Sequence, residues 1–311
     1  MVLDARSMEN CEVRFLILSD GRMGHLNQSI AFAKHANATY EIVPVIFTCK
    51  LSKILSYLFD FLHIYSTVLF KLEKPLLQKF DAIVSAGSST YYANKTLSRI
   101  CGFKSITMML PKGYRYDFDV IFAQTHDNPP LRKNIISLPA NMSFTQPQGL
   151  FSALKPSIGI IIGGNNAIFT MDAGKLKTQL DSIAQKFKDY DIALTTSPRT
   201  PLHIEKLLED YHFAYTVIFS HHKINPIADF LHHCKTIFIT MDSTSMISEA
   251  ISYGNANVEI LPLNDAQDNK FYAMVENLEK QEFLHIFDGT VAGKNKKIDF
   301  GIMAQKGLDL V

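Results

Sequence analysis

Cysteine is scarce in this chain of 311 residues. The four copies are Cys11, Cys49, Cys101 and Cys234. They form no C-x-x-C pair, so their spacing argues against a zinc site and against a disulfide framework. This usage is typical of a protein kept in a reducing cytosol.

An excess of charge of either sign is also lacking. The chain has 31 Lys and Arg against 30 Asp and Glu, a formal net charge of +1. No global field would therefore draw it to nucleic acid or to an acidic membrane, although a local basic patch is compatible with these totals. With 47% hydrophobic and 20% charged residues, the composition is that of an ordinary globular protein.

No secretory signal and no membrane span are evident. The opening stretch MVLDARSMENCEVR is charged and lacks the apolar core of a signal peptide. No run reaches about 18 uninterrupted apolar residues, so we predict no transmembrane helix. We expect a cytoplasmic protein, either free or peripheral on the cytoplasmic face of a membrane.

The nearest approach to a span is Leu51–Leu72, which Lys53, Asp60 and His63 interrupt. Asp60 would be costly at mid-bilayer, so one or two amphipathic helices explain the segment better. Its apolar residues nearly encircle the helix: Ile54, Leu55, Leu58, Phe59, Phe61, Leu62, Tyr65, Val68 and Leu69. Such a helix is either deeply buried or faces lipid. Both readings stay open, the second as a peripheral membrane contact through residues 51–72.

Short apolar runs alternate with helix-like segments. In the first half they are Phe15–Leu18, Tyr40–Phe47, Ala82–Ser85, Ser105–Leu110, Val120–Ala123 and Ile135–Leu138. In the second half they are Ile158–Ile162, Ile192–Thr196, Ala214–Phe219, Thr236–Thr240 and Asn257–Leu261. Apolar runs separated by helices predict parallel sheets covered on both sides. The polar stretch Asn141–Ser157 is the expected joint between two doubly wound domains, residues 1–150 and 151–311.

The two halves open in the same way, with SDGRMGHLNQS in the first and IGIIIGGNNAIFTMD in the second. Each predicts a strand that runs into a glycine turn at a helix N-terminus, where backbone N–H groups can bind an anion. His25 in the first loop could move a proton near neutral pH. A plain strand-to-helix turn is the alternative. Neither loop is a full G-x-G-x-x-G, so a dinucleotide fold of the dehydrogenase type is not supported.

The stretch MDSTSMISEAISYG follows a buried strand. Asp242 or Ser243 can cap the next helix. With Thr244 and Ser245, and with the backbone amides, Ser243 could hold a diphosphate, and Glu249 could accept hydrogen bonds from ribose hydroxyls. A well-capped βαβ unit without a ligand is the alternative.

Two further loops contain cations. In LTTSPRTP, Arg199 could clamp a phosphate or stack on a base, or it could be a solvated turn residue. In SHHKINPI, the adjacent His221 and His222 point to a metal only weakly, because neighbours on a chain usually point apart. We expect neither a metal nor a cofactor. The lack of a G-x-S-x-G elbow makes acyl transfer improbable as the chemistry.

Several motifs together resemble the mitochondrial-fission Elm family, a glycosyltransferase-like family of bacteria and plants. They are SDGRMGHLNQS, SAGSST, FDVIFAQTHDNPP, IIGG, LTTSPRTP, the Asn225-Pro226 pair, MDSTSMISEAISYG and NKFYAMVENL. They occur in order from about residue 15 to residue 280, and the G-H-x-N-Q and D-S-x-S-M-x-S-E-A elements are the specific ones.

The resemblance implies an α/β fold of the GT-B type, with two doubly wound Rossmann-like domains, an interdomain cleft and no metal. It places the acceptor beside the first domain, with His25 near the acceptor hydroxyl. The residues of this acceptor-side loop are Gly21, Gly24, Asn27 and Gln28. It places a nucleotide sugar in the second domain. The residues that would line this donor site are Gly163, Gly164, Thr196, Ser197, Arg199, Asp242, Ser243, Ser245 and Glu249.

The chain departs from the family pattern at three loops. Family members often have Arg-Arg where this chain has Ser88-Ser89, and an Arg where Pro198 stands. After IIGG the family commonly has Ser, His and Arg, whereas this chain reads NNAIF. Each change removes a cation that would neutralise a diphosphate.

Three functions remain in view. The first is transfer of a sugar from a nucleotide diphosphate sugar to a lipid-linked or cell-envelope glycan acceptor. In it, His25 acts as general base, and the helix at Ser243 and the Gly163-Gly164 turn stabilise the leaving diphosphate. The second is a nucleotide-sugar epimerase of the same fold. The third is a non-catalytic membrane-side adaptor, because plant members of the resembled family are associated with mitochondrial fission and with recruitment of a dynamin-like protein.

Overall fold

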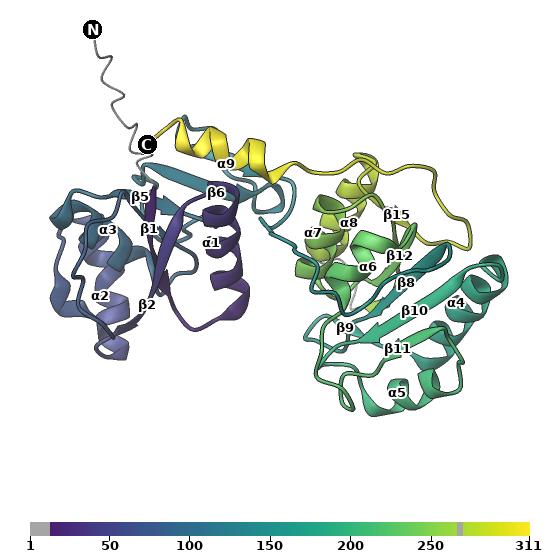
Figure 1. Cartoon of the computed structure of the whole chain (residues 1–311). Helices are drawn as coiled ribbons and strands as arrows, with labels where there is room; N and C mark the ends of the chain where they lie inside the picture. Colours follow the sequence, from purple (N-terminus) through teal and green to yellow (C-terminus); the bar gives the residue numbers. More distant parts are fainter. Residues whose placement is uncertain (1–12, 266–269) are drawn as a thin grey trace, which may run out of the picture. The chain divides into compact units, whose positions relative to one another are not determined.

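The computed structural model describes residues 13–265 and 270–311. The chain packs as two units (Figure 1). Unit 1 reaches Leu138 and also includes Gly301–Val311, and unit 2 is Pro139–Phe300. The sequence instead predicts a division after residue 150, with the C-terminal residues in the second domain. Most of the N-terminal stretch, with Cys11, lies outside the described residues, and so does Asn269 of the NKFYAMVENL motif.

Unit 1 is built on a seven-stranded sheet with the order β3-β2-β1-β4-β5-β6-β7. The strands are β1 (Arg14–Ser19), β2 (Thr39–Phe47), β3 (Phe70–Leu72), β4 (Ala82–Ser85), β5 (Lys104–Thr107), β6 (Val120–Gln124) and β7 (Ile135–Leu138). Neighbours pair in parallel, except that β3 is antiparallel to β2 at the edge of the sheet. The prediction of a parallel sheet is confirmed for the predicted strands, and β3 was not among them.

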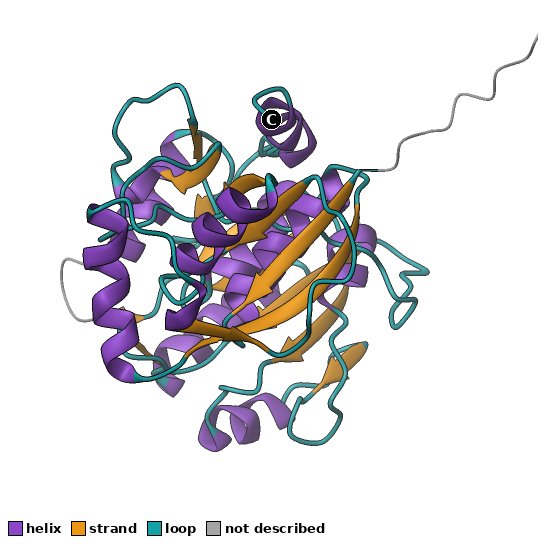
Figure 2. Cartoon of the chain, turned by 90° about the vertical axis from the view of Figure 1, so that its left-hand side faces the viewer, coloured by secondary structure: helices purple, strands orange, loops and turns teal. Residues whose placement is uncertain are grey.

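Helices cover both faces of this sheet (Figures 1 and 2). They are α1 (Met23–His35), α2 (Lys50–Phe61), α3 (Tyr91–Cys101) and α9 (Phe300–Leu308), with short 3₁₀ turns η1 (Thr67–Leu69) and η2 (Thr125–Asp127). The α1 face is closed by aromatic rings, because Phe32 stacks on Phe15 at 5.3 Å and lies 5.1 Å from Phe122. Gly307 of α9 packs against the Phe122 ring, where a Cβ atom would come within 2.4 Å of it.

Unit 2 is built on a six-stranded parallel sheet with the order β11-β10-β8-β12-β13-β15. The strands are β8 (Ser157–Ile162), β10 (Asp191–Thr196), β11 (Tyr215–Val217), β12 (Thr236–Thr240), β13 (Asn257–Leu261) and β15 (His285–Ile286). A separate antiparallel pair joins β9 (Phe169–Thr170) to β14 (Asn264–Asp265). The helices are α4 (Ala173–Lys186), α5 (Leu202–Glu209), α6 (Ile227–His233), α7 (Thr244–Ser252) and α8 (Lys270–Lys280).

Each of the eleven apolar runs singled out in the sequence contains a strand, so this part of the prediction is confirmed. The strands that were not predicted, β3, β9, β14 and β15, are two or three residues long. Runs this short have no detectable periodicity, which explains why the sequence does not announce them.

The segment Leu51–Leu72 forms one helix, α2, as one of the two predicted alternatives, followed by η1 and β3. Its apolar residues are mostly outside: Leu51, Ile54, Leu58, Phe61, Leu62 and Val68 are each at least half exposed. The polar positions Ser52, Ser56 and Asp60 are the buried ones. Core burial of the whole segment is therefore wrong, although Leu69 is buried. Among the residues that the structure describes, no helix is long and apolar enough to cross a membrane.

Each sheet reverses its strand order next to its first strand. In unit 1 the chain builds outward from β1 to β2, then returns to place β4 on the other side of β1. In unit 2 the same reversal occurs between β8 and β12. Ligands of open α/β sheets bind at the carboxyl ends of the strands at such reversals. The loops after β1 and β4, and after β8 and β12, are therefore where a functional site is expected.

Candidate functional site

At the reversal of unit 1, Asp20 and His25 form a pair. Asp20 follows β1, and its Oδ2 lies 3.0 Å from Nδ1 of His25. His25 stands in the first turn of α1 and not in the loop before it. Because a carboxylate can only accept, Nδ1 carries the proton and Nε2 is left with a lone pair. The Asp20 side chain is 6% exposed and that of His25 is 19% exposed, so the pair is shielded but reachable.

Gly87, in the loop after β4, borders this pair. Its φ of +89° is left-handed, and a Cβ atom there would lie 2.4 Å from Nδ1 of His25 and 3.0 Å from Oδ2 of Asp20. A larger residue would push the histidine out of position. The SAGSST motif therefore contributes space for the pair.

The other residues predicted for this loop divide into two groups. Gly21 has a φ of +80° and forms the turn after β1, while Gly24 and Asn27 are exposed on α1. Gln28 is buried, and its Oε1 accepts a hydrogen bond from Gln124 at 3.0 Å. Gln28 therefore ties α1 to the end of β6, and its side chain is already engaged within the protein.

At the reversal of unit 2, Asp242 links three strand ends. Its side chain is 0% exposed. Oδ2 accepts hydrogen bonds from the N–H of Gly164 at 2.9 Å and from Arg199 at 2.8 Å, and Oδ1 accepts from the Thr240 hydroxyl at 2.7 Å. The loops after β8, β10 and β12 are thereby held together by one carboxylate. Asp242 therefore fixes the positions of the loops that form the predicted donor site.

Gly163 and Gly164 serve this junction by their small size. A Cβ atom at Gly163 would lie 2.1 Å from Asp242, and one at Gly164 would lie 2.0 Å from the carbonyl oxygen of Arg199. Their N–H groups donate to Thr240 and to Asp242, so neither is available to a diphosphate. The turn is also not at a helix N-terminus, because β9 intervenes before α4 begins at Ala173. That expectation is therefore wrong for the second half of the chain.

The loop after β10 is folded on its own hydroxyls. Thr196 is buried and accepts the N–H of Phe219 at 2.8 Å, which links β10 to the end of β11. The Ser197 hydroxyl accepts the N–H of Arg199 at 3.2 Å. The side chain of Arg199 is 42% exposed, and only one of its terminal nitrogens has a hydrogen-bond partner among the described residues. Arg199 is therefore a cation at this junction that retains free donors.

The helix N-terminus predicted after β12 is present, at α7. Ser243 caps it, with its hydroxyl accepting the N–H of Met246 at 3.4 Å. The next two N–H groups, of Thr244 and Ser245, have no partner inside a helix. Ser245 is exposed. Free N–H groups and the positive end of the helix dipole suit an anion at this point.

Glu249 lies on the same helix, about one turn beyond Ser245. It is half-buried, and within residues 13–265 and 270–311 no donor is found for its carboxylate. Burial without a partner raises the pKa of Glu249 to about 7. A carboxylate kept in this state is suited to accept hydrogen bonds from a ligand.

Glu249→Gln is expected to stabilise the free protein in a pH-dependent way. With a folded pKa of about 7 against an ordinary 4.5, the wild-type fold loses stability as the pH rises between these values. The Gln variant lacks this loss. Its melting temperature should match the wild type near pH 4.5 and exceed it at pH 8. The matched control is Glu276→Gln, on α8, and equal gains at both pH values would contradict the assignment.

No metal centre accompanies these residues: nowhere in the described ranges do three or more His, Cys, Asp or Glu side chains gather as ligands. His221 lies 3.8 Å from Glu209, at an exposed position. One cation does stand near the His25 pair, since Lys53 of α2 donates to the Ser88 hydroxyl at 3.2 Å. Three residues that contact these groups were not predicted as site residues from the sequence: Asp20, Lys53 and Thr240. Only Asp20 had a local signal, five positions before His25.

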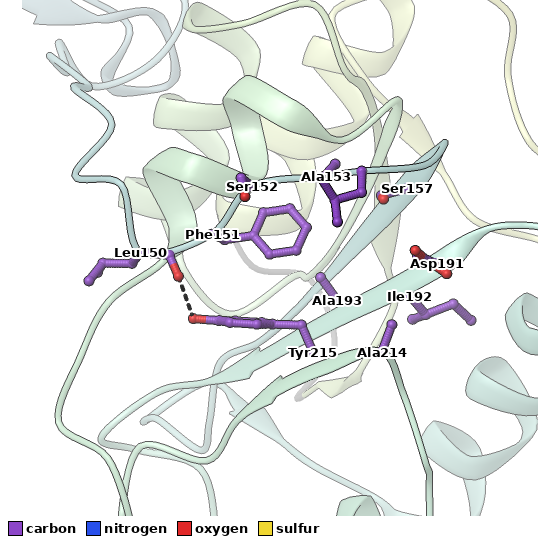
Figure 3. Close-up of a pocket in the computed structure, with 11 residues that line it drawn as sticks. Leu150, Phe151, Ser152, Ala153, Ser157, Asp191, Ile192, Ala193, Ala214 and Tyr215 are labelled. Carbon is purple, nitrogen blue, oxygen red and sulfur yellow. Dashed lines mark hydrogen bonds between the residues drawn. The ribbon is translucent and has the colours of Figure 1, made fainter.

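A separate pocket of about 360 Å³ lies at the amino ends of the strands β8 and β10 in unit 2, opposite their carboxyl ends (Figure 3). It is lined by the segment around Phe151 and by Ser157 and Asp191, the first residues of β8 and β10. Tyr215 donates to the carbonyl oxygen of Leu150 at 3.0 Å and closes one side. Since ligands of such sheets bind at the carboxyl ends, this pocket is not the expected site.

Solved structures with the same fold have low sequence identity to the chain. A UDP-glucosyltransferase from Polygonum tinctorium, capable of glucosylating indoxyl, aligns over 96% of this chain and 91% of its own, with a TM-score of 0.50 and 10% identity. MurG of Acinetobacter baumannii aligns over 96% and 90%, with a TM-score of 0.47 and 12% identity. With its two doubly wound units, the chain has the GT-B fold. This confirms the predicted fold class; the interdomain cleft stays a prediction.

At the level of sequence, an uncharacterized protein of Rickettsia prowazekii is 26% identical, over 88% of this chain and 90% of its own length. The model of the family described as mitochondrial fission ELM1 matches residues 23–300, which include the His25 turn and the whole of α7. The resemblance seen in the motifs is thereby confirmed, and the chain belongs to the mitochondrial fission ELM1 family.

Proposed function

We propose that the chain is a metal-independent glycosyltransferase that moves a sugar from a nucleoside diphosphate sugar to a hydroxyl of a lipid-linked or cell-envelope glycan acceptor. Unit 2 binds the donor at the carboxyl ends of β8, β10 and β12, and unit 1 provides the base. Its GT-B fold is compatible with this chemistry but does not by itself establish it.

The donor site is assigned to α7 and its surroundings. The diphosphate binds at the free N–H groups of Thr244 and Ser245, with Arg199 as the neighbouring cation. Glu249 accepts hydrogen bonds from the ribose hydroxyls. Gly163, Gly164, Thr196, Ser197 and Asp242 shape the loops and need not touch the nucleotide, because their polar groups are largely engaged within the protein.

The reaction uses His25 as general base. Nε2 takes the proton from the acceptor hydroxyl while its oxygen forms a bond to the anomeric carbon of the sugar. The bond from that carbon to the diphosphate oxygen breaks, and the electron pair leaves with the nucleoside diphosphate. Asp20 keeps Nδ1 protonated and stabilises the imidazolium that forms. The positive end of α7 and Arg199 stabilise the charge that develops on the leaving group.

The observation that carries the proposal is the unpartnered carboxylate of Glu249, one turn from the two free N–H groups at the start of α7. Anion-binding donors and a carboxylate acceptor at this spacing match the diphosphate and the adjoining ribose of a nucleoside diphosphate. Both lie at the strand-order reversal, where such sheets bind nucleotides.

Thermal melting in the presence of nucleotides tests the proposed donor site. UDP, GDP, ADP, TDP and CMP are added in turn, without metal. At 100 times its Kd, a ligand stabilises the fold by about 2.7 kcal/mol, which is readily visible as a rise in melting temperature. We expect a rise with one nucleoside diphosphate, its loss in Glu249→Ala, and its retention in the control Glu276→Gln.

Two other outcomes would redirect the assignment. Conversion of the sugar nucleotide alone, with no acceptor present, would identify an epimerase of the same fold. No rise with any nucleotide would contradict the donor site and would favour an adaptor that uses the fold without catalysis.

A further inference from the structure

The helix α2 buries polar residues and exposes several of its large apolar ones. Its inward face holds Ser52, Ser56 and Asp60, spaced four residues apart. The Ser56 hydroxyl lies 2.8 Å from the hydroxyl of Tyr114, and Asp60 accepts from buried Lys95 at 2.7 Å. These polar contacts hold α2 to the body of unit 1, together with Leu55, Tyr57 and Phe59, which are partly buried against the core.

The opposite face of α2 is apolar and exposed. We call it the apolar stripe: Leu51, Ile54, Leu58, Phe61 and Leu62. Their exposed fractions run from 50% at Leu58 to 71% at Phe61. Val68 of η1 is also exposed, at 76%, and its carbonyl oxygen accepts a hydrogen bond from Thr48, which precedes α2. Several large apolar side chains exposed together on one helix face are typical of an interaction site.

The segment that carries the stripe is mostly positive in charge. Between residues 46 and 79 there are five lysines and two acidic residues, in a chain whose net charge is only +1. One of the two acids, Asp60, is buried in ion pairs with Lys95 and Arg115, which leaves Glu73 as the exposed one. Exposed lysines include Lys50 at the start of α2 and Lys71 on β3.

This combination selects among partners. Lysine is depleted from protein–protein interfaces. A two-fold dimer through the stripe would bring two copies of the same positive surface together. An anionic lipid surface neutralises lysines and accepts an apolar helix face at the same time. We propose that α2 docks unit 1 on a membrane containing anionic lipid, with the apolar stripe inserted among the acyl chains and the lysines at the headgroups.

The docking helix also adjoins the His25 pair. Lys53 of α2 donates to Ser88, and the preceding Gly87 packs against the His25 ring. A lipid-linked acceptor would thus be presented next to the base. This last point rests on the proposed function, whereas the docking itself does not require it.

Vesicle co-sedimentation with the full chain tests the docking. Phosphatidylcholine vesicles are compared with vesicles that also contain phosphatidylglycerol. We expect the affinity of the wild type for the anionic vesicles to be at least about tenfold higher than for phosphatidylcholine vesicles. The triple variant Ile54→Ser, Leu58→Ser and Phe61→Ser should lose this binding and keep the wild-type melting temperature. The control is Leu131→Ser with Leu154→Ser, two residues more exposed than the stripe but outside it.

Failure of the proposal has clear signatures. Equal binding to both vesicle types, or full binding by the triple variant, would overturn it. So would a dimer, seen by analytical ultracentrifugation, that the triple variant abolishes, because the stripe would then belong to a second copy of the chain. A wild type that binds vesicles but no nucleotide would retain the docking surface and reject only the transferase.

Discussion

His25→Ala is expected to lower the rate of sugar transfer by about 10²- to 10⁴-fold, the usual contribution of a general base. Affinity for the nucleoside diphosphate should not change, because the donor residues belong to α7 and its neighbouring loops in unit 2. The substrate is a sugar derivative of the nucleoside diphosphate that raises the melting temperature, and a bacterial lipid extract is the source of acceptor. The measurement is the rate at which the nucleoside diphosphate is released. Asp20→Asn should give an intermediate loss, since it removes the group that fixes the tautomer.

The matched control for this substitution is His203→Ala, an exposed histidine on α5 with no role in the site. It should transfer sugar at the wild-type rate. Wild-type turnover in His25→Ala would show that the Asp20–His25 pair is not the base, whatever unit 2 binds.

Lys95→Met is expected to destabilise the protein by about 3–5 kcal/mol, the typical cost of removing one partner of a buried ion pair. Lys95 is 3% exposed and Asp60 is 1% exposed, with 2.7 Å between Nζ and Oδ1. Asp60 also accepts the N–H of Arg115 at 2.7 Å, so the pair joins α2 to α3 and to the loop before β6. Urea unfolding at neutral pH measures the loss.

The double variant Asp60→Leu with Lys95→Met is the control for burial of an unpaired charge. Removing both charges together should cost less than Lys95→Met alone, because buried Asp60 is then not left with Arg115 as its remaining cation, and Asp117 still pairs with Arg115. A single-variant cost below about 1 kcal/mol, the range of exposed pairs, would show that these charges do not anchor α2.

Much of the sheet could be predicted from sequence, because buried strands are short apolar runs and chain order sets their parallel pairing. The orientation of α2 could not. Apolar residues surround most of that helix, so its pattern does not say which face turns inward. Hydrogen bonds to residues distant in the chain set the orientation of α2. Asp60 pairs with Lys95, 35 residues away, and Ser56 pairs with Tyr114, 58 residues away.

The candidate site shows the same division. The loops that line it were identified correctly as strand ends, since turn glycines and hydroxyl clusters are local signals. What the polar groups do inside those loops depends on contacts across the sheet. The N–H groups of Gly163 and Gly164 are satisfied by residues 77 and 78 positions away, and no local pattern announces this. Whether the predicted residues bind a nucleotide stays a prediction.

Backbone hydrogen exchange, measured with and without the nucleoside diphosphate that raises the melting temperature, tests the central claim most directly. If unit 2 binds the donor at its strand-order reversal, exchange should slow at Thr244 and Ser245, whose N–H groups would bind the diphosphate, and in the loop around Arg199. The pocket near Phe151 should be unaffected. Protection confined to unit 1, or to the Phe151 pocket, would contradict the donor site and with it the proposed transfer.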